Sequence, residues 1–333
     1  MPSADQVKAL LSSLIEGDEA HFYSVAMQIA AHEARLGHGK LAEEIRALID
    51  KAKSKPGLPG KAPIPLARPR GEAAELLTVS YPAVHLRDMV LSGPIRRKLD
   101  RVIREHRSIR IIRSRGLPPR KKLLLIGKPG TGKTLTASAL AGELGLPLFV
   151  VRLDALITKF MGETAAKLRL IFDALSHTRG VYLFDEFDSI GSARGLTNDV
   201  GEIRRIVNSF LQLVEQDQSD SIIIAATNHV NILDRALFRR FDDVIEYDLP
   251  DRSRIIEAFK SKLSAFPTER IQWTKAAVAA RGLSFADIAR VSEDAIKDAV
   301  IHERPSVTNN DLIVAIYDRK TAVRHRRNGK KLP

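Results

Sequence analysis

The feature that most constrains this chain is a glycine-rich segment between an apolar run, residues 122–126, and a periodic stretch, residues 133–144. The run is typical of a buried strand, and the stretch has the periodicity of a helix. The segment fits the pattern Gly-x-x-x-x-Gly-Lys-Ser/Thr and consists of Gly127, Lys128, Pro129, Gly130, Thr131, Gly132, Lys133 and Thr134. Glycines let backbone N–H groups converge on phosphate oxygens, and the start of a helix adds a favourable dipole. In this context the pattern predicts a loop that binds nucleotide phosphates.

Two loop residues and two acidic residues form the predicted hydrolytic centre. We expect Lys133 to reach the β- and γ-phosphates of ATP and the Thr134 hydroxyl to ligate Mg²⁺. The apolar run 181–184 ends in Asp185 and Glu186. Asp185 is expected to hold Mg²⁺ through water, and Glu186 to orient and activate the attacking water. Adjacent acids after a strand can also be a solvated strand end, but beside a phosphate loop they predict an ATPase.

A third polar side chain follows another predicted strand. The apolar run 221–226 leads into Thr227 and Asn228. An asparagine after a strand is often only a helix cap. Together with the two motifs above, Asn228 is expected to reach the attacking water and the γ-phosphate.

Strand-like and helix-like segments alternate through the middle of the chain. Apolar runs occur at 122–126, 148–151, 181–184 and 221–226, and periodic helical stretches at 133–144, 163–176 and 202–214. Buried strands that alternate with helices predict an α/β fold, a parallel sheet with helices on both faces. No strand pattern follows Pro250, so a small, all-helical C-terminal lid is predicted after the sheet domain.

Composition divides the chain into five predicted parts. Residues 1–53 read as short amphipathic helices, for which we expect a partner- or client-binding role, with simple docking or oligomerisation as the alternative. Five prolines fall between residues 54 and 70, so 54–74 is predicted to be a linker. The α/β nucleotide-binding domain is predicted at 75–250, the helical lid at 251–317 and a basic tail at 318–333.

The bulk composition excludes several classes of protein. The 333 residues contain no cysteine, which excludes disulfides and zinc–thiolate sites. The sequence has no run of eighteen apolar residues, so no membrane span is expected. It also has no secretory signal, so a cytoplasmic location is expected. The net charge of +13 lies in two segments, 104–122 with +7 and 318–333 with +6. These segments are predicted to be solvated surfaces, with binding of a polyanion as the alternative.

From about residue 85 to residue 317 the sequence resembles an AAA ATPase module. The segment 226–242 contains Ala-Thr-Asn, then Leu-Asp-Arg-Ala-Leu, then Arg239 and Arg240 before Phe-Asp, as in the second region of homology of that family. The resemblance implies that Arg239 and Arg240 are arginine fingers that reach the γ-phosphate bound by a neighbouring subunit. It also implies a ring, usually a hexamer. The segment 86–90 lies where the family cradles adenine, mostly through backbone groups.

The sequence departs from the family pattern in the loop and in the lid. The loop has Lys128 where the family often has proline, which removes no required group. At the start of a lid helix the family often has Ser-Gly-Ala-Asp, whereas this chain has Phe285 in place of the glycine. The adenine and lid contacts are therefore open. No clear sensor-2 arginine is present, and Arg290 is a weak candidate.

The segment 158–164 resembles the first pore loop of AAA protein remodellers. An aromatic residue, Phe160, and an aliphatic one, Met161, precede Gly-Glu, and in a ring such loops grip an extended polypeptide. A large apolar side chain holds varied sequences through burial alone. The alternative is that Phe160 is a core residue beneath the loop. The stretch 191–203 is a weaker candidate for a second pore loop.

Three functions are compatible with these features. The first is a ring that unfolds, disassembles or remodels protein clients, since a helical module, a linker and one AAA module resemble katanin- and spastin-like machines. A degradative role would need a separate peptidase. The second is a nucleic-acid-dependent ATPase, supported by the basic segments but by no recognised nucleic-acid-binding motif. The third is a nucleotide-controlled binding switch. The first is our hypothesis.

Overall fold

The structure is a computed structural model, and it describes residues 19–35, 38–39, 42–44, 47, 49, 72–156, 161–187, 200–228 and 238–327. The chain separates into two compact units, residues 1–66 and 67–333. In the first unit, helix α2 spans Glu19–Arg35 and buries Val25 and Ile29. Its periodicity agrees with the predicted second helix. The predicted first helix, before residue 19, lies outside the described residues.

The second unit contains a six-stranded sheet in the order β1-β3-β4-β5-β2-β6. All neighbouring strands are parallel except β1, which pairs with β3 in the antiparallel sense. The strands are β1 (Leu77–Ser80), β2 (Lys122–Gly127), β3 (Leu148–Val151), β4 (Val181–Phe184), β5 (Ile222–Thr227) and β6 (Asp243–Tyr247). The predicted α/β fold is thus confirmed, and the four predicted strands are β2 to β5. The two strands at the edges, β1 and β6, were not predicted.

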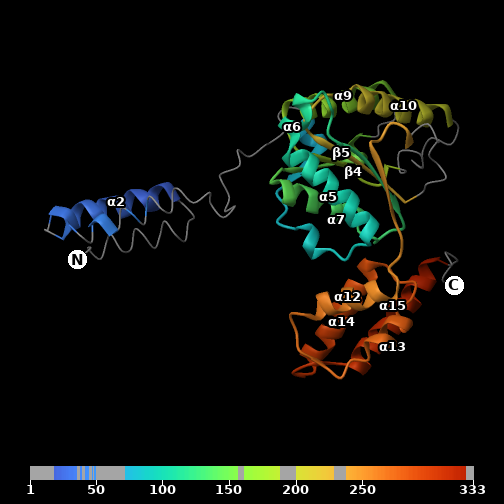
Figure 1. The fold of residues 1–333 in the computed structure, drawn as a ribbon. Helices are drawn as coiled ribbons and strands as arrows, with labels where there is room; N and C mark the ends of the chain where they lie inside the picture. The colour runs from blue at the N-terminus through green and yellow to red at the C-terminus, as the bar shows by residue number, and fades with distance from the viewer. Residues whose placement is uncertain are drawn as a thin grey trace. The chain divides into compact units, whose positions relative to one another are not determined.

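Helices cover both faces of this sheet (Figure 1). On one face lie α5 (Gly93–Arg107) and α7 (Lys133–Leu144), and on the other α9 (Met161–His177) and α10 (Val200–Gln216). The shorter elements are α4 (Ala73–Leu76), the 3₁₀ helix η1 (Leu86–Asp88), α6 (Ile109–Ser114) and α8 (Leu153–Leu156). Strands with two covered faces are apolar throughout, which explains why β2, β4 and β5 show no alternation.

Each face of the sheet has its own apolar core. On the α9–α10 face, Phe184 of β4 meets Phe210 of α10 edge to face, with ring centroids 4.8 Å apart. Phe149 of β3 and Tyr182 of β4 stack at 4.5 Å in the same core. The core on the α5–α7 face is aliphatic and includes Leu99 of α5. These two cores hold the sheet rigid, so the residues at its strand ends keep fixed positions.

The C-terminal part of the second unit is a helical lid with a core of its own. Its helices are α12 (Arg252–Leu263), α13 (Trp273–Ala279), α14 (Phe285–Ile301) and α15 (Asn309–Arg327). The expectation of an all-helical lid is wrong in one detail, because β7 (Thr268–Glu269) and β8 (Val307–Thr308) form a parallel pair. Two-residue strands are too short to leave a pattern in the sequence. Helix α15 also continues past residue 317, where a boundary was expected.

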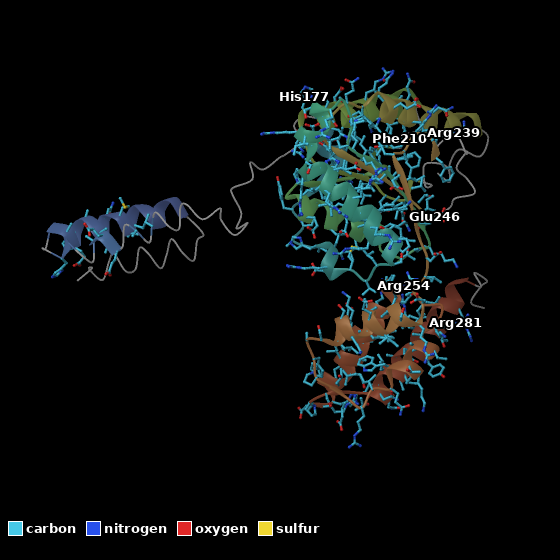
Figure 2. All side chains as sticks on the ribbon, in the orientation of Figure 1. His177, Phe210, Arg239, Glu246, Arg254 and Arg281 are labelled. Carbon is cyan, nitrogen blue, oxygen red and sulfur yellow. The ribbon has the colours of Figure 1, made fainter. Side chains whose placement is uncertain are left out.

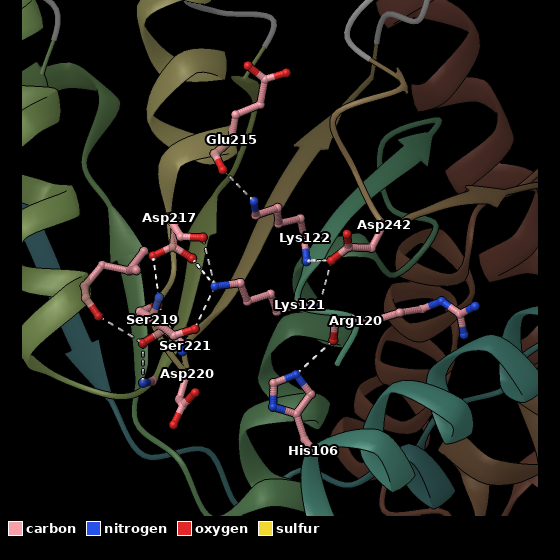
Figure 3. Close-up of polar contacts among 12 residues, drawn as sticks. His106, Arg120, Lys121, Lys122, Glu215, Asp217, Ser219, Asp220, Ser221 and Asp242 are labelled. Carbon is pink, nitrogen blue, oxygen red and sulfur yellow. Dashed lines mark hydrogen bonds and ion pairs between the residues drawn. The ribbon is translucent and has the colours of Figure 1, made fainter. Parts of the chain in front are cut away.

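A polar cluster occupies the amino-terminal edge of the main sheet (Figure 3). The buried Lys121 donates to Asp217 Oδ2 at 2.6 Å and to Ser219 O at 2.7 Å. Asp242 Oδ2 accepts from the backbone N–H of Lys121 and of Lys122, at 2.8 and 2.9 Å. These bonds satisfy polar groups where β2 begins, on the edge opposite the predicted nucleotide loop.

Candidate active site

The strand order brings three predicted site segments to one edge of the sheet. Strand β5 lies between β4 and β2, and all three are parallel, so their carboxyl ends meet. The phosphate loop follows β2, Asn228 follows β5, and Asp185 follows β4. The carboxyl edge of a parallel sheet is the usual place for a ligand in this class of fold.

Lys133, the first residue of α7, connects the loop to the end of β5. Its Nζ donates to Gly127 O at 2.7 Å, to Lys128 O at 3.1 Å and to Asn228 Oδ1 at 2.8 Å. The side chain is buried although it carries a charge. A buried ammonium that donates to three neutral oxygens beside a phosphate loop suits an anion better than a core position.

Thr134 and Asp185 face each other across the same edge. The Thr134 hydroxyl donates to Asp185 Oδ2 at 2.5 Å. Mg²⁺ prefers oxygen ligands and commonly takes only one or two from protein, completing its shell with water and phosphate. A hydroxyl and a carboxylate within contact of each other, beside a phosphate loop, therefore fit the expected Mg²⁺.

The backbone at Glu186 is unusual. Its φ is +50°, in the left-handed region that a residue with a Cβ rarely adopts. Asp185 Oδ1 accepts a hydrogen bond from the Glu186 backbone N–H at 2.9 Å and supports this turn. Glu186 is thereby exposed to the cleft, while its neighbour Phe187 is buried in the core. Strained conformations of this kind are concentrated at functional sites.

The site is a cleft between the loop and the lid. A cavity of about 360 Å³ is lined by loop and sheet residues and by four lid residues, Lys262, Phe285, Ala286 and Ala289. The loop and sheet residues that line it are Pro129, Gly130, Gly132, Lys133, Thr134, Leu135, Asp185, Glu186 and Asn228. The predicted hydrolytic residues thus share one cavity, and the lid forms its second wall.

A smaller cavity of about 70 Å³ adjoins the first. The two have Gly132, Leu135, Lys262 and Phe285 in common. The smaller one is also lined by Asp88, Met89 and Val90, within the segment expected to cradle adenine. Phe285, the residue that departs from the family pattern, therefore stands where the two cavities meet.

Sequence reasoning missed Lys262, which lies on α12 and lines both cavities. Nothing in its local pattern distinguishes it from Lys260, since both are lysines near the end of one helix. The weak candidate Arg290 is exposed and is not among the described residues that line either cavity. Lid residues reach the cleft through tertiary packing, which short-range periodicity does not encode.

Arg239 and Arg240 lie outside this cleft. Arg239 is exposed at the edge of the α/β domain (Figure 2). Arg240 Nε lies 3.1 Å from Glu215 Oε1 of α10. Neither is among the described residues that line the cavity. Phe160 and the stretch 191–199 lie outside the described residues, and Met161 is the first residue of α9.

Comparison with known proteins identifies the family. A family model for the ATPase family associated with various cellular activities (AAA) matches residues 123–249. Over 318 residues, 96% of this chain and 96% of the relative, the chain is 36% identical to the Uncharacterized AAA family ATPase y4kL of Sinorhizobium fredii (strain NBRC 101917 / NGR234). The chain belongs to the AAA family of ATPases. It therefore binds and hydrolyses ATP.

Other relatives match about three fifths of this AAA ATPase. A proteasome-activating nucleotidase of Methanoregula boonei is 34% identical over 210 residues, 60% of this chain and 48% of that protein. An ATP-dependent zinc metalloprotease, FtsH 1 of Methylacidiphilum infernorum, is 37% identical over 206 residues, 59% of this chain and 32% of that protein. The chain thus spans about half of the first and a third of the second.

Two features are absent from the described ranges of this ATPase. Within them, no helix has both the length and the apolar character that a membrane crossing requires. Nor do they contain a group of three or more His, Cys, Asp or Glu side chains placed to hold a metal ion.

Proposed function

We propose that this AAA ATPase forms a ring, most simply a hexamer, and uses ATP hydrolysis to remodel, unfold or disassemble protein clients. The observation that carries the ring is the location of Arg239. It is exposed and does not line the cleft of its own subunit, so it is free to complete a neighbour's cleft. An arginine supplied in trans is worth roughly 10³–10⁵ in rate in related phosphoryl-transfer systems.

Within each cleft we assign roles to residues that share the cavity. Lys133 and the loop N–H groups bind the phosphates, and Asn228 and Glu186 orient the attacking water, with Glu186 accepting its proton. Asp185 and Thr134 would hold Mg²⁺, which neutralises charge on the phosphates when bound. Arg239, and Arg240 once released from Glu215, would stabilise the transition state of the adjacent subunit.

The client assignment is supported by the relatives and by the sequence. Two kinds of relative are named as a proteasome-activating nucleotidase and an ATP-dependent metalloprotease. We propose that Phe160 and Met161 grip polypeptide in the central channel, where burial of one such side chain contributes about 1.5–3 kcal/mol. Residues 1–53 would recruit clients or an adaptor through the linker 54–74. That a separate peptidase is a partner remains a prediction, and so does the resemblance to katanin-like machines.

A nucleic-acid partner is less well supported, because several cations of segment 104–122 already have acidic partners. Arg107 pairs with Glu143 at 3.0 Å, Arg120 with Glu105 at 3.0 Å, and Lys121 with Asp217 at 2.6 Å. Arg113 pairs with Asp220. Three of these four acids lie outside the segment, so they offset three of its seven net positive charges, which weakens attraction for a polyanion.

A subunit-mixing experiment tests the shared active site. Lys133→Ala and Arg239→Ala are each expected to be inactive alone and to recover part of the ATPase rate when mixed, because a mixed interface pairs an intact loop with an intact arginine. Arg281→Ala, an exposed arginine of the lid, is the matched control and should keep full activity. Absence of recovery in mixtures that co-assemble, measured by mass photometry, contradicts the proposal.

A second experiment tests the client class. ATPase rates of the wild type and of Phe160→Ala are measured with an unfolded polypeptide and with single-stranded DNA. Stimulation by polypeptide that is lost in Phe160→Ala supports threading through the ring. Stimulation by DNA alone, unchanged in Phe160→Ala, replaces the remodeller with a nucleic-acid-dependent ATPase. No stimulation by either favours a nucleotide-controlled switch.

A further inference from the structure

The start of lid helix α14 touches the phosphate loop directly. The backbone N–H of Ala286 donates to Gly130 O at 3.1 Å. A Cβ placed on Gly130 would lie 2.6 Å from Ser284 Oγ and 2.9 Å from Ala286 Cβ. Since Phe285, Ala286 and Ala289 also line the cleft, the first turn of α14 is one wall of the nucleotide site. Its position determines the width of that site.

A capping box holds this first turn. The Ser284 hydroxyl accepts from the Asp287 backbone N–H at 3.2 Å and donates to Asp287 Oδ2 at 2.7 Å. Asp287 Oδ2 also accepts from the Ser284 backbone N–H at 3.0 Å. Reciprocal bonds of this kind satisfy the free N–H groups at a helix start and define where the helix begins. Asp287 is therefore the anchor of the wall.

The second oxygen of that anchor is held by the last helix of the lid. Arg319 of α15 donates through Nε to Asp287 Oδ1 at 2.8 Å, and its Nη2 lies 2.7 Å from the same atom. The two side chains are only 18% and 14% exposed, so solvent screens the pair weakly. Partial burial acts to raise the pKa of Asp287, but the bonds from Ser284 and Arg319 outweigh it and lower the pKa below its ordinary value. Asp287 is thus an ionised acceptor, and the pair is charge-assisted.

We propose that Arg319 is a positioning residue for nucleotide binding. It fixes the Asp287 carboxylate, which fixes the first turn of α14 against Gly130, and so keeps the lid wall at the distance that a nucleotide requires. Arg319 is not one of the described residues that line the cavity. It therefore acts through Asp287 and not by contact with ATP. Loss of Arg319 should weaken nucleotide binding and leave the hydrolytic groups in place.

The lid contains a matched control at the far end of the same two helices. Arg304 pairs with Asp298 of α14 and, at 2.5 Å, with Asp311 of α15. Arg304→Gln thus removes a bridge between α14 and α15 that is comparable in charge but remote from Gly130. A general loss of lid stability would appear in both variants, whereas a positioning effect appears only at Arg319.

The test compares Arg319→Gln, Arg319→Lys and Arg304→Gln in the full-length protein. Equilibrium binding of a fluorescent ATP analogue, the thermal midpoint without nucleotide, and kcat and KM are measured for each. We expect Arg319→Gln to weaken binding and raise KM by about three- to tenfold, the range of one ordinary hydrogen bond, with kcat changed less than about twofold. Arg319→Lys should recover part of the affinity. Arg304→Gln should bind the analogue with wild-type affinity, even if its thermal midpoint falls as far as that of Arg319→Gln.

Two results overturn the proposal. One is wild-type affinity in Arg319→Gln. The other is equal weakening in Arg304→Gln at an equal loss of thermal midpoint. The inference rests on the proposed nucleotide site, which Lys133→Ala tests separately in the same binding assay. If Lys133→Ala loses binding while Arg319→Gln keeps it, the positioning role alone fails, and if Lys133→Ala keeps binding, the site itself is wrong.

Discussion

The contact between the phosphate loop and the lid gives a sharp prediction for Gly130→Ala. Gly130 has a φ of +75°, and an added Cβ would approach Ser284 Oγ to 2.6 Å and Ala286 Cβ to 2.9 Å. The matched control is Gly116→Ala. Gly116 has nearly the same φ, +74°, but its Cβ would meet no atom within 4 Å. The two substitutions therefore share the backbone penalty and differ in the collision with α14.

The expected magnitudes follow from these two terms. An alanine in the left-handed region costs about 1–2 kcal/mol, which is the full expected effect of Gly116→Ala. Overpacking adds about 1–3 kcal/mol, so Gly130→Ala should cost about 2–5 kcal/mol unless the lid moves away. If the lid moves, the excess appears as weaker nucleotide binding, because the displaced turn is a wall of the cleft.

The assay uses the one tryptophan of the chain, Trp273, which packs against the lid core. Urea unfolding followed by Trp273 fluorescence reports on the lid, and circular dichroism reports on the whole chain. Binding of a fluorescent ATP analogue is measured alongside. Equal unfolding free energies and equal affinities in Gly130→Ala and Gly116→Ala would refute the contact between loop and lid. A deficit only in Gly130→Ala supports it.

Three other predictions concern buried or strained groups. Lys121→Met leaves the Asp217 carboxylate, which is only 3% exposed, without its cation. Urea unfolding should therefore show a free energy of unfolding lower by about 3–5 kcal/mol, and adding Asp217→Asn to the same chain should restore part of this loss. Burial lowers the pKa of His106, so the unfolded chain binds the proton more readily. The free energy of unfolding should therefore fall as pH drops below the unfolded value of about 6.5, and His106→Gln should flatten that slope between about pH 8 and pH 5. Glu186→Gly should relieve about 1–2 kcal/mol of strain at φ +50° and still bind ATP, while its hydrolysis should be lost in a phosphate-release assay.

The central fold was predictable because its signals are short-range. A buried parallel strand is a continuous apolar run, and β2 to β5 each show one. Strand β1 lies at the sheet edge and contains the polar Thr78 and Ser80, and β6 carries the exposed Glu246, so neither gives such a run. The β7–β8 pair has two residues per strand and exists only because the lid packing brings Pro267 and Val307 together.

The sequence by itself determined the phosphate loop, the acids after β4 and the asparagine after β5, because each depends on a residue type at a fixed position relative to a strand end. Parallel pairing then places these ends at one edge. Only the tertiary structure decided which lid residues form the opposite wall. Lys262 and Phe285 form this wall and Arg319 contacts it through Asp287, and because the three residues lie on different helices, their positions depend on how the lid core packs. Packing of that kind is a property of many distant contacts at once, so no local spacing in the sequence records it.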